Sequence, residues 1–329
     1  MPYTFNVRRH WLKAAGATAL LLAGWSVQAQ NYPDKTVRIV VGAPAGGASD
    51  VTARMLAEKM SPLLGQTVII DNKPGAGGLL GIQELLKSPR DGYTLMVNIS
   101  GVVSEVPHAI KAPFDPLKVL MPVAEMARGG LVLVTNTQTG AQDLDGFIKY
   151  VKANKGKTSF ASYSAGTVSH TLGLELNKAA GLDMVHAGYK GSPPALQDLI
   201  GGSVQSLFDG AGNVLPHVKS GRLKALAVSS PQRMSLFPDA PTFAELGYKD
   251  LTEVVSIMLF TTPDVPAPIQ AKVREAAMKA LQDTKLRESF NTLGMAMGTS
   301  ATPEELLAGL RSASDKQAAR LKAIGFKIE

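Results

Sequence analysis

Three observations in the sequence predict an α/β fold made of two similar sheets. Short β-branched runs alternate with amphipathic stretches, which is typical of parallel sheets covered by helices on both faces. This alternation starts near residue 36 and starts again near residue 131. The chain has 329 residues, which is longer than one hydrophobic core usually supports and therefore favours two domains.

The first series of elements occupies residues 36–98. Buried strands are predicted at 36–41, 67–71 and 93–98, and amphipathic helices at 50–60 and 79–87 lie between them. Ser49 or Asp50 is a natural N-cap for the first helix, which should end near Gly65. This β-α-β-α-β order predicts a parallel sheet.

The second series begins after Gly129-Gly130, where we expect the domain boundary. Strands are predicted at 131–135, 157–161, 185–187, 206–209, 223–229 and 254–261, and helices at 142–153, 169–179, 194–200, 269–282, 285–293 and 303–324. The helical C-terminus has no sheet of its own, so it should pack back on the first domain. The predicted lobes are 30–129 with 252–329, and 130–251.

The first 29 residues have the pattern of a secretory signal peptide. Arg8, Arg9 and Lys13 precede an uncharged run over 14–27, and the segment closes on Ala29. That run is shorter than the roughly 20 residues a membrane span needs, so we expect no membrane insertion. The sequence therefore predicts export to the periplasm through the general secretory route or, because of the paired arginines, the twin-arginine route.

Composition and motifs argue against several functions. There is no cysteine, and hence no disulfide framework or thiolate chemistry. The formal net charge is +7, of which three charges lie in the predicted signal, so a nucleic-acid partner is not expected. No P-loop, no G-x-S-x-G elbow and no metal-ligand spacing of histidines occurs, so we predict neither a catalytic site nor a metal or cofactor.

Two loops carry the pattern of an anion site. Residues 42–50 and 162–170 are rich in glycine and hydroxyl side chains, and each follows a strand and precedes a helix. Free N–H groups at a helix N-terminus favour anions, and glycine lets the backbone approach a ligand closely. Because one loop comes from each domain, we expect the two to face each other across a cleft and to bind one small anion.

Seven motifs in order resemble the substrate-binding proteins of tripartite tricarboxylate transporters, the Bug-type solute receptors. They are PAGGASD (44–50), DNKPGAGG (71–78), DGYTL (91–95), FDP (114–116), SYSAGTVSH (162–170), HAGYKGSPPALQDLIGG (186–202) and DAPTFAELGY (239–248). The resemblance covers nearly the whole chain after the predicted signal. It implies a two-lobed periplasmic-binding-protein fold of the type II-like kind, with two mixed or parallel sheets flanked by helices and a ligand cleft between them. The lobes close on a carboxylate, which is held partly through ordered waters.

The resemblance also implies site residues and a partner. By motif position the ligand-binding residues are Gly46, Gly47, Ala48, Ser49 and Asp50 from the first loop, and Ser162, Gly166, Thr167 and His170 from the second. Asn98, Ser100 and Asp209 follow strands near the cleft and are secondary candidates. The implied partners are a mono-, di- or tricarboxylate and a two-subunit membrane permease driven by an ion gradient, with the receptor itself a monomer.

Three departures from the family pattern concern the pocket. Members often carry an aromatic residue where this chain has Ala43, a tryptophan near Ser256, and a proline where Gly188 stands. Two missing rings imply a roomier pocket, so no particular substrate follows. Two other functions stay open on the sequence: a sensory binding protein that reports its ligand to a membrane kinase, and a periplasmic hydrolase.

Overall fold

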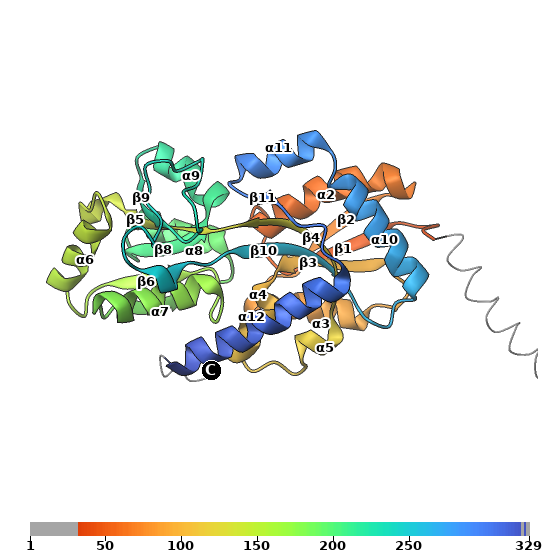
Figure 1. Cartoon of the computed structure of the whole chain (residues 1–329), viewed down its shortest axis with the longest axis horizontal. Coiled ribbons are helices and arrows are strands. Elements are labelled where there is room, and N and C mark those ends of the chain that lie inside the picture. The colour runs from red at the N-terminus through yellow and green to blue at the C-terminus, as the bar shows by residue number, and fades with distance from the viewer. Residues whose placement is uncertain (1–31, 324–325, 327–329) are drawn as a thin grey trace, which may run out of the picture.

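The computed structural model describes residues 32–323 and 326, arranged as two sheets side by side with helices on both faces of each (Figure 1). We call each sheet, with the helices packed on it, a lobe. The export signal predicted at 1–29 lies outside the described residues. Within the described residues, no helix is long and apolar enough to cross a membrane.

The sheet of the first lobe has six strands in the order β11-β4-β10-β3-β1-β2. β1 pairs in parallel with β2 and β3, whereas β10 pairs antiparallel with β3 and β4. The bounds are β1 (Val37–Val41), β2 (Val68–Asn72), β3 (Thr94–Ile99), β4 (Met121–Gly129), β10 (Val255–Thr261) and β11 (Ala296–Met297). The sheet is therefore mixed, and strands from both ends of the described chain build it.

The sheet of the second lobe has five strands in the order β7-β6-β8-β5-β9. β6 is parallel to β7 and β8, and β5 is antiparallel to β8 and β9. The bounds are β5 (Leu131–Asn136), β6 (Ser159–Ser162), β7 (Val185–Gly188), β8 (Ser206–Gly210) and β9 (Leu223–Val228). β5 is buried throughout, so its alternate side chains enter the cores on the two faces of the sheet.

Helices cover all four sheet faces. In the first lobe α2 (Ala48–Leu64), α10 (Ala267–Ala280) and α11 (Thr284–Thr292) share one core, and α3 (Leu79–Lys87), α4 (Gly101–Ser104), α5 (Pro116–Val119) and α12 (Pro303–Ala323) lie on the other face. In the second lobe α6 (Leu144–Ala153) and α7 (Val168–Ala180) pack opposite α8 (Ser192–Gly201) and α9 (Ala211–Lys219). Short 3-10 turns complete the elements at η1 (Ala76–Gly78), η2 (Val106–His108), η3 (Thr137–Thr139) and η4 (Lys249–Leu251).

Two extended segments connect the lobes. β4 runs almost directly into β5, with Gly130 between them, and the chain returns through the segment before β10 (Figure 1). Ser229 links the two crossings, because its hydroxyl accepts a 2.8 Å hydrogen bond from the Leu131 amide and donates to the Glu253 carbonyl. A Cβ on Gly130 would lie 2.6 Å from the Ser230 amide nitrogen, so glycine allows the crossings to touch.

The structure corrects two expectations about elements and confirms a third. β4 and α9 were not predicted; β4 carries Glu125 and Arg128, and Pro216 lies within α9. The first helix starts two residues earlier than predicted and its N-cap is Gly47, so neither Ser49 nor Asp50 caps it. The predicted parallel order holds for β1, β2 and β3, and the later strand β10 joins β3 antiparallel, so the whole sheet is mixed.

Candidate functional site

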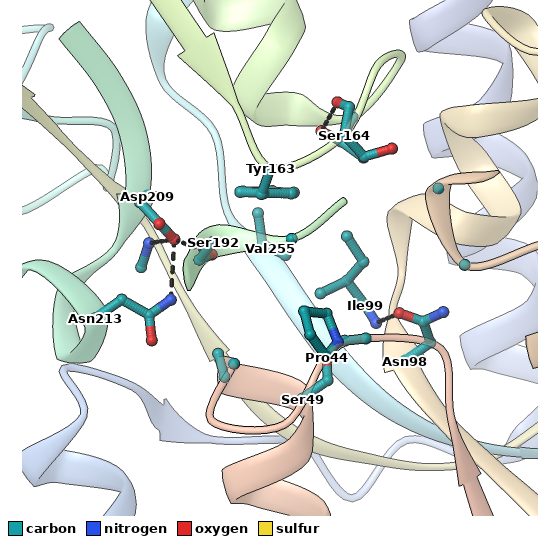
Figure 2. A pocket seen from close by; sticks show the side chains of 18 of the residues that line it. Pro44, Ser49, Asn98, Ile99, Tyr163, Ser164, Ser192, Asp209, Asn213 and Val255 are labelled. Carbon is teal, nitrogen blue, oxygen red and sulfur yellow. Dashed lines mark hydrogen bonds between the residues drawn. The ribbon is translucent and has the colours of Figure 1, made fainter. Parts of the chain in front are cut away.

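A cavity of about 480 Å³ lies between the two lobes, at the ends of their strands (Figure 2). This volume is within the range of small-molecule sites in proteins. Both lobes contribute to its walls, mostly through loops that precede helices. The main lining segments are 42–44, 47–49, 75–78, 98–99, 129–131, 163–165, 188–192 and 209–213.

The start of α2 presents hydrogen-bond donors to this cavity. The first helical hydrogen bond joins the Val51 amide to the Gly47 carbonyl, so the preceding amides of Ala48 and Ser49 have no helical acceptor. No other acceptor among residues 32–323 binds these two amides, and the Ser49 hydroxyl is likewise without a partner there. Ala48 and Ser49 both line the cavity. The α2 N-terminus can therefore donate several hydrogen bonds to one carboxylate.

Asp50 shapes this loop from behind. Its carboxylate accepts hydrogen bonds from the Gly46 amide at 2.9 Å, from Arg54 Nε at 3.1 Å and from Asn72 Nδ2 at 2.9 Å. Burial alone would raise the pKa of Asp50, but the bonds from Arg54, Gly46 and Asn72 outweigh burial and lower it. Asp50 is therefore an ionised anchor for the loop, and it is not among the residues that line the cavity.

The start of α7 differs from the expectation of a second free helix N-terminus. The first helical amide, that of Val168, donates a 2.6 Å hydrogen bond to the Glu105 carboxylate, which comes from the first lobe. The Gly166 amide donates to His170 Nδ1 at 3.0 Å, and the Thr167 hydroxyl donates to the Ser164 carbonyl at 2.7 Å. The protein's own groups thus satisfy much of this terminus, and the two helix starts are not equivalent.

Two stacked histidines lie behind the second loop. The rings of His170 and His186 are 3.6 Å apart at their centroids, and His186 Nε2 is 2.7 Å from the Ser162 hydroxyl. Burial, and for His170 also the neighbouring His186, lowers the pKa of His170 to about 3; burial lowers the pKa of His186 to about 4. Both rings are therefore neutral at neutral pH. Ser162 is fully buried and does not line the cavity, so its hydroxyl has no access to a bound molecule.

Asp209 holds together the segments of the second lobe that line the cavity. Its Oδ1 accepts hydrogen bonds from the Ser192 hydroxyl at 2.8 Å, the Gly210 amide at 2.6 Å and Asn213 Nδ2 at 3.0 Å (Figure 2). Burial raises the pKa of Asp209 to about 6, although these three bonds oppose the shift. Asp209 therefore fixes the starts of α8 and α9 against the cavity.

The wall between the two loops is largely apolar. It includes Ile99, Leu131, Val255 and Ile257, and Val255 and Ile99 face the centre of the cavity (Figure 2). Ser256 lies between two lining residues of β10, and its side chain donates to Glu125 instead. Of the two positions where a missing ring was expected to enlarge the pocket, only Ala43 lines it.

Contacts across the cleft show that the lobes are closed. A Cβ on Gly191 would lie 2.3 Å from Pro44 Cγ, and one on Gly77 would lie 3.1 Å from the Ser164 hydroxyl oxygen. The Gly212 amide of the second lobe donates a 2.9 Å hydrogen bond to the Leu293 carbonyl of the first. The two lobes therefore meet at several points around the cavity.

The predicted ligand-binding residues fall into two groups. Those that line the cavity are Gly47, Ala48, Ser49, Asn98, Thr167 and Asp209. Those that do not line it are Gly46, Asp50, Ser100, Ser162, Gly166 and His170. Members of the second group hold the loops in place; for example, the Ser100 amide donates to the Ser256 carbonyl at 2.7 Å.

Sequence reasoning missed several lining residues. Gly75 to Gly78 line the cavity, although this run was interpreted from the sequence only as a family motif and not as part of the site. Gly75, Gly77 and Gly78 have positive φ, and a Cβ on Gly78 would lie 2.3 Å from Asn98 Nδ2, so close packing explains the glycines. Lys190 and Ser192 were also missed, although they stand beside a glycine in the loop before a helix, as the predicted residues do.

Comparisons with known proteins agree with this geometry. Residues 52–321 match the model of the tripartite tricarboxylate transporter family receptor. Protein BugT of Bordetella pertussis is 34% identical over 307 residues, which cover 92% of this chain and 93% of that protein.

Solved structures of similar proteins have the same architecture. The periplasmic binding protein BugD superposes with a TM-score of 0.85 at 31% identity, over 91% of this chain and all of that one. MatC from Rhodopseudomonas palustris, solved with bound malate, gives a TM-score of 0.82 at 28% identity over 88% of this chain and all of that one. The expected two-lobed fold of periplasmic binding proteins is therefore confirmed. The chain belongs to the tripartite tricarboxylate transporter family of receptors, which are solute-binding proteins.

Proposed function

We propose that this protein captures a small carboxylate between its two lobes and delivers it to a membrane transporter. One observation carries the proposal. The Ala48 and Ser49 amides and the Ser49 hydroxyl have no hydrogen-bond partner among the described residues, yet both residues line the cavity between the lobes. Such a cluster of donors at a helix N-terminus suits a carboxylate. The bound malate in the related MatC supports the same class of ligand.

The arrangement of the chain supports capture by closure. We propose lobes of 30–129 with 252–329, and 130–251, which open about the crossings near Gly130 and Ser229. Because Gly191 touches Pro44 across the cleft, a ligand enters only when the lobes separate. Closure then buries the ligand, and the receptor acts without chemical change to its cargo.

The partners follow from the family. We propose that the receptor works in the periplasm as a monomer, after removal of residues 1–29, and that it docks on a two-subunit permease. A sensory role would use the same cavity with a membrane kinase as the partner. Reconstitution of the receptor with each partner separates the two roles.

A thermal-shift screen tests the capture of a carboxylate. Mono-, di- and tricarboxylates are added to the purified protein beside neutral sugars and amines. A ligand that binds only the native state increases the free energy of unfolding, by about 2.7 kcal/mol at a hundredfold excess over Kd. The midpoint temperature of thermal unfolding rises as a result. We expect at least one carboxylate to raise it. A shift with sugars or amines alone would refute the proposal.

A further inference from the structure

We infer that Arg320, on the C-terminal helix of the first lobe, is a positioning residue that favours the closed form of the receptor by binding Glu175 of the second lobe. Neither side chain lines the cavity, so the pair acts on the lobes and not on the ligand. This inference rests on the proposed capture by closure and names a contact that stabilises it. Four features of the structure support it.

First, α12 begins in the first lobe and ends beside the second (Figure 1). Leu306 and Leu310, near its start, belong to a core cluster of the first lobe, and the helix packs on β4 and α4. Near its end it contacts α7 instead, because the Lys178 ammonium group donates to the Ala323 carbonyl at 3.3 Å. The helix therefore carries side chains of the first lobe to the second.

Second, the pair between Arg320 and Glu175 is largely buried. Arg320 Nε is 2.5 Å from Glu175 Oε1, and the two side chains are 11% and 13% exposed. Burial raises the pKa of Glu175 to about 7; Arg320 and Lys316 oppose this rise, and Glu253 and Asp250 add to it. A buried charge that loses its partner is costly, so the pair opposes the separation of α7 from α12.

Third, a second carboxylate keeps Arg320 oriented when α7 moves away. Arg320 Nη2 donates a 3.0 Å hydrogen bond to Glu253 Oε2, and Glu253 lies on the crossing before β10. The Glu253 amide donates to the Ser229 carbonyl at 2.7 Å, which fixes this residue to the segment about which the lobes move. Glu253 therefore holds the guanidinium group in both forms, and Glu175 meets it when the lobes close.

Fourth, the same helix touches the second loop of the cavity. Gln317 Nε2 donates to the Gly166 carbonyl at 3.4 Å, and the Phe326 ring is 5.5 Å from the His170 ring at their centroids. Gly166 directly precedes Thr167, which lines the cavity. Contacts between α12 and the α7 region therefore set the position of this loop against a bound ligand.

Two variants test the inference at about pH 8, where Glu175 is mostly ionised. Glu175→Gln removes the charge of the partner, and Arg320→Met removes the guanidinium group. Small-angle X-ray scattering of the ligand-free protein gives its radius of gyration, and calorimetry gives its affinity for each carboxylate that the thermal-shift screen finds. The loss of a contact made only in the closed form must change one of these two quantities.

We expect each variant to increase the radius of gyration of the ligand-free protein, or to weaken the binding of every carboxylate by the same factor of about ten. The double variant should bind about as Arg320→Met does, because both changes remove one shared contact. Arg311→Met is the matched control, because Arg311 is exposed on the same helix. It should match the wild type in both measurements.

A purely structural role would lower the stability of the variants to urea and leave the radius of gyration and the affinities unchanged, and that result would overturn the inference. A loss of affinity that differs between carboxylates would also overturn it, because Arg320 would then act on the ligand. If no carboxylate binds the wild type, the proposed function fails, and the radius of gyration alone decides the inference. If carboxylates bind the variants and the wild type alike and the radius is unchanged, only the inference fails.

Discussion

The Glu105 carboxylate of the first lobe accepts a 2.6 Å hydrogen bond from the Val168 amide, the first helical amide of α7 in the second lobe. A carboxyl group of the protein itself thus occupies the helix start that the sequence assigned to the ligand. Burial raises the pKa of Glu105 to about 8, with Glu253 adding to the shift and the Val168 bond and Arg320 opposing it. This contact links the lobes beside the cavity, and its strength depends on pH.

Replacement of Glu105 by glutamine should remove a pH-dependent part of the stability. An unfolded glutamate releases its proton near pH 4.3, whereas folded Glu105 keeps it up to about pH 8. The stabilisation is therefore complete below the lower value and is lost as pH rises through the upper one, by at most about 1.4 kcal/mol per pH unit. Glutamine keeps an oxygen for Val168 without titrating. Urea unfolding should be measured from about pH 5 to about pH 9. The free energy of unfolding of the wild type should fall relative to that of Glu105→Gln as pH rises.

Glu58→Gln is the control, because Glu58 is exposed on α2. Its stability difference from the wild type should not depend on pH in this range. A constant difference between the wild type and Glu105→Gln would show that Glu105 does not hold its proton in the folded state.

Gly191→Ala should prevent full closure. The added Cβ would lie 2.3 Å from Pro44 Cγ, so the two loops must move apart, and the ligand loses contacts with one lobe. Carboxylate affinity should fall at least about tenfold, which corresponds to about 1.4 kcal/mol. Isothermal calorimetry with the best carboxylate of the screen measures this loss.

Gly181→Ala is the control for the backbone strain that alanine introduces at a glycine with positive φ. Gly181 also has positive φ, at 63°, but a Cβ there has no atom within 4 Å. That variant should lose about 1 kcal/mol of stability and bind normally. Equal affinity of the two variants would mean that the contact between Gly191 and Pro44 is not part of closure.

Asp50→Asn should loosen the α2 loop and leave the fold intact. The neutral side chain loses the charge-assisted bond to Arg54 and part of the hold on the Gly46 amide, worth about 1 to 3 kcal/mol. We expect weaker carboxylate binding in calorimetry together with an unchanged circular dichroism spectrum. Asp145→Asn, at an exposed position on α6, should bind as the wild type does. Normal carboxylate affinity of Asp50→Asn would show that ligand binding does not depend on the anchoring of the loop by Asp50.

Ser162→Ala tests the hydrolase alternative. Ser162 and His186 are hydrogen-bonded like a nucleophile and its base, but the serine is fully buried. The variant should lose about 1 kcal/mol of stability because His186 Nε2 loses its partner. Its carboxylate affinity should stay within about twofold of the wild type, by calorimetry. Ester turnover by the wild type that disappears in this variant would instead establish catalysis.

Sequence periodicity predicted most of the elements because their apolar patterns are local. The helix at 79–87 has the same bounds in the structure, and the helix that was expected to end near Gly65 does so, with Gly65 in the left-handed conformation. β4 was missed because Glu125 and Arg128 interrupt its apolar pattern. The Glu125 carboxylate accepts hydrogen bonds from Ser256 and Thr299, which are distant in sequence.

The sequence predicted the parts of the cavity lining that depend on one local segment of backbone. It could not predict contacts that involve a residue from the other lobe. Ala48 and Ser49 follow from a glycine loop before a helix. The occupation of α7 by Glu105 could not be read from either segment alone, because the two residues are 63 positions apart. His170 accepts a hydrogen bond from Gly166 within its own loop, but its burial depends on rings from elsewhere in the chain, such as the stacked His186.

A crystal structure of the protein with the best carboxylate of the screen tests the central claim most directly. We expect one carboxylate of the ligand within about 3 Å of the Ala48 or Ser49 amide nitrogen, or joined to them by a single water. The Val168 amide should still donate to Glu105. A carboxylate bound at the start of α7 in place of Glu105, with the Ala48 and Ser49 amides left to solvent, would contradict the account.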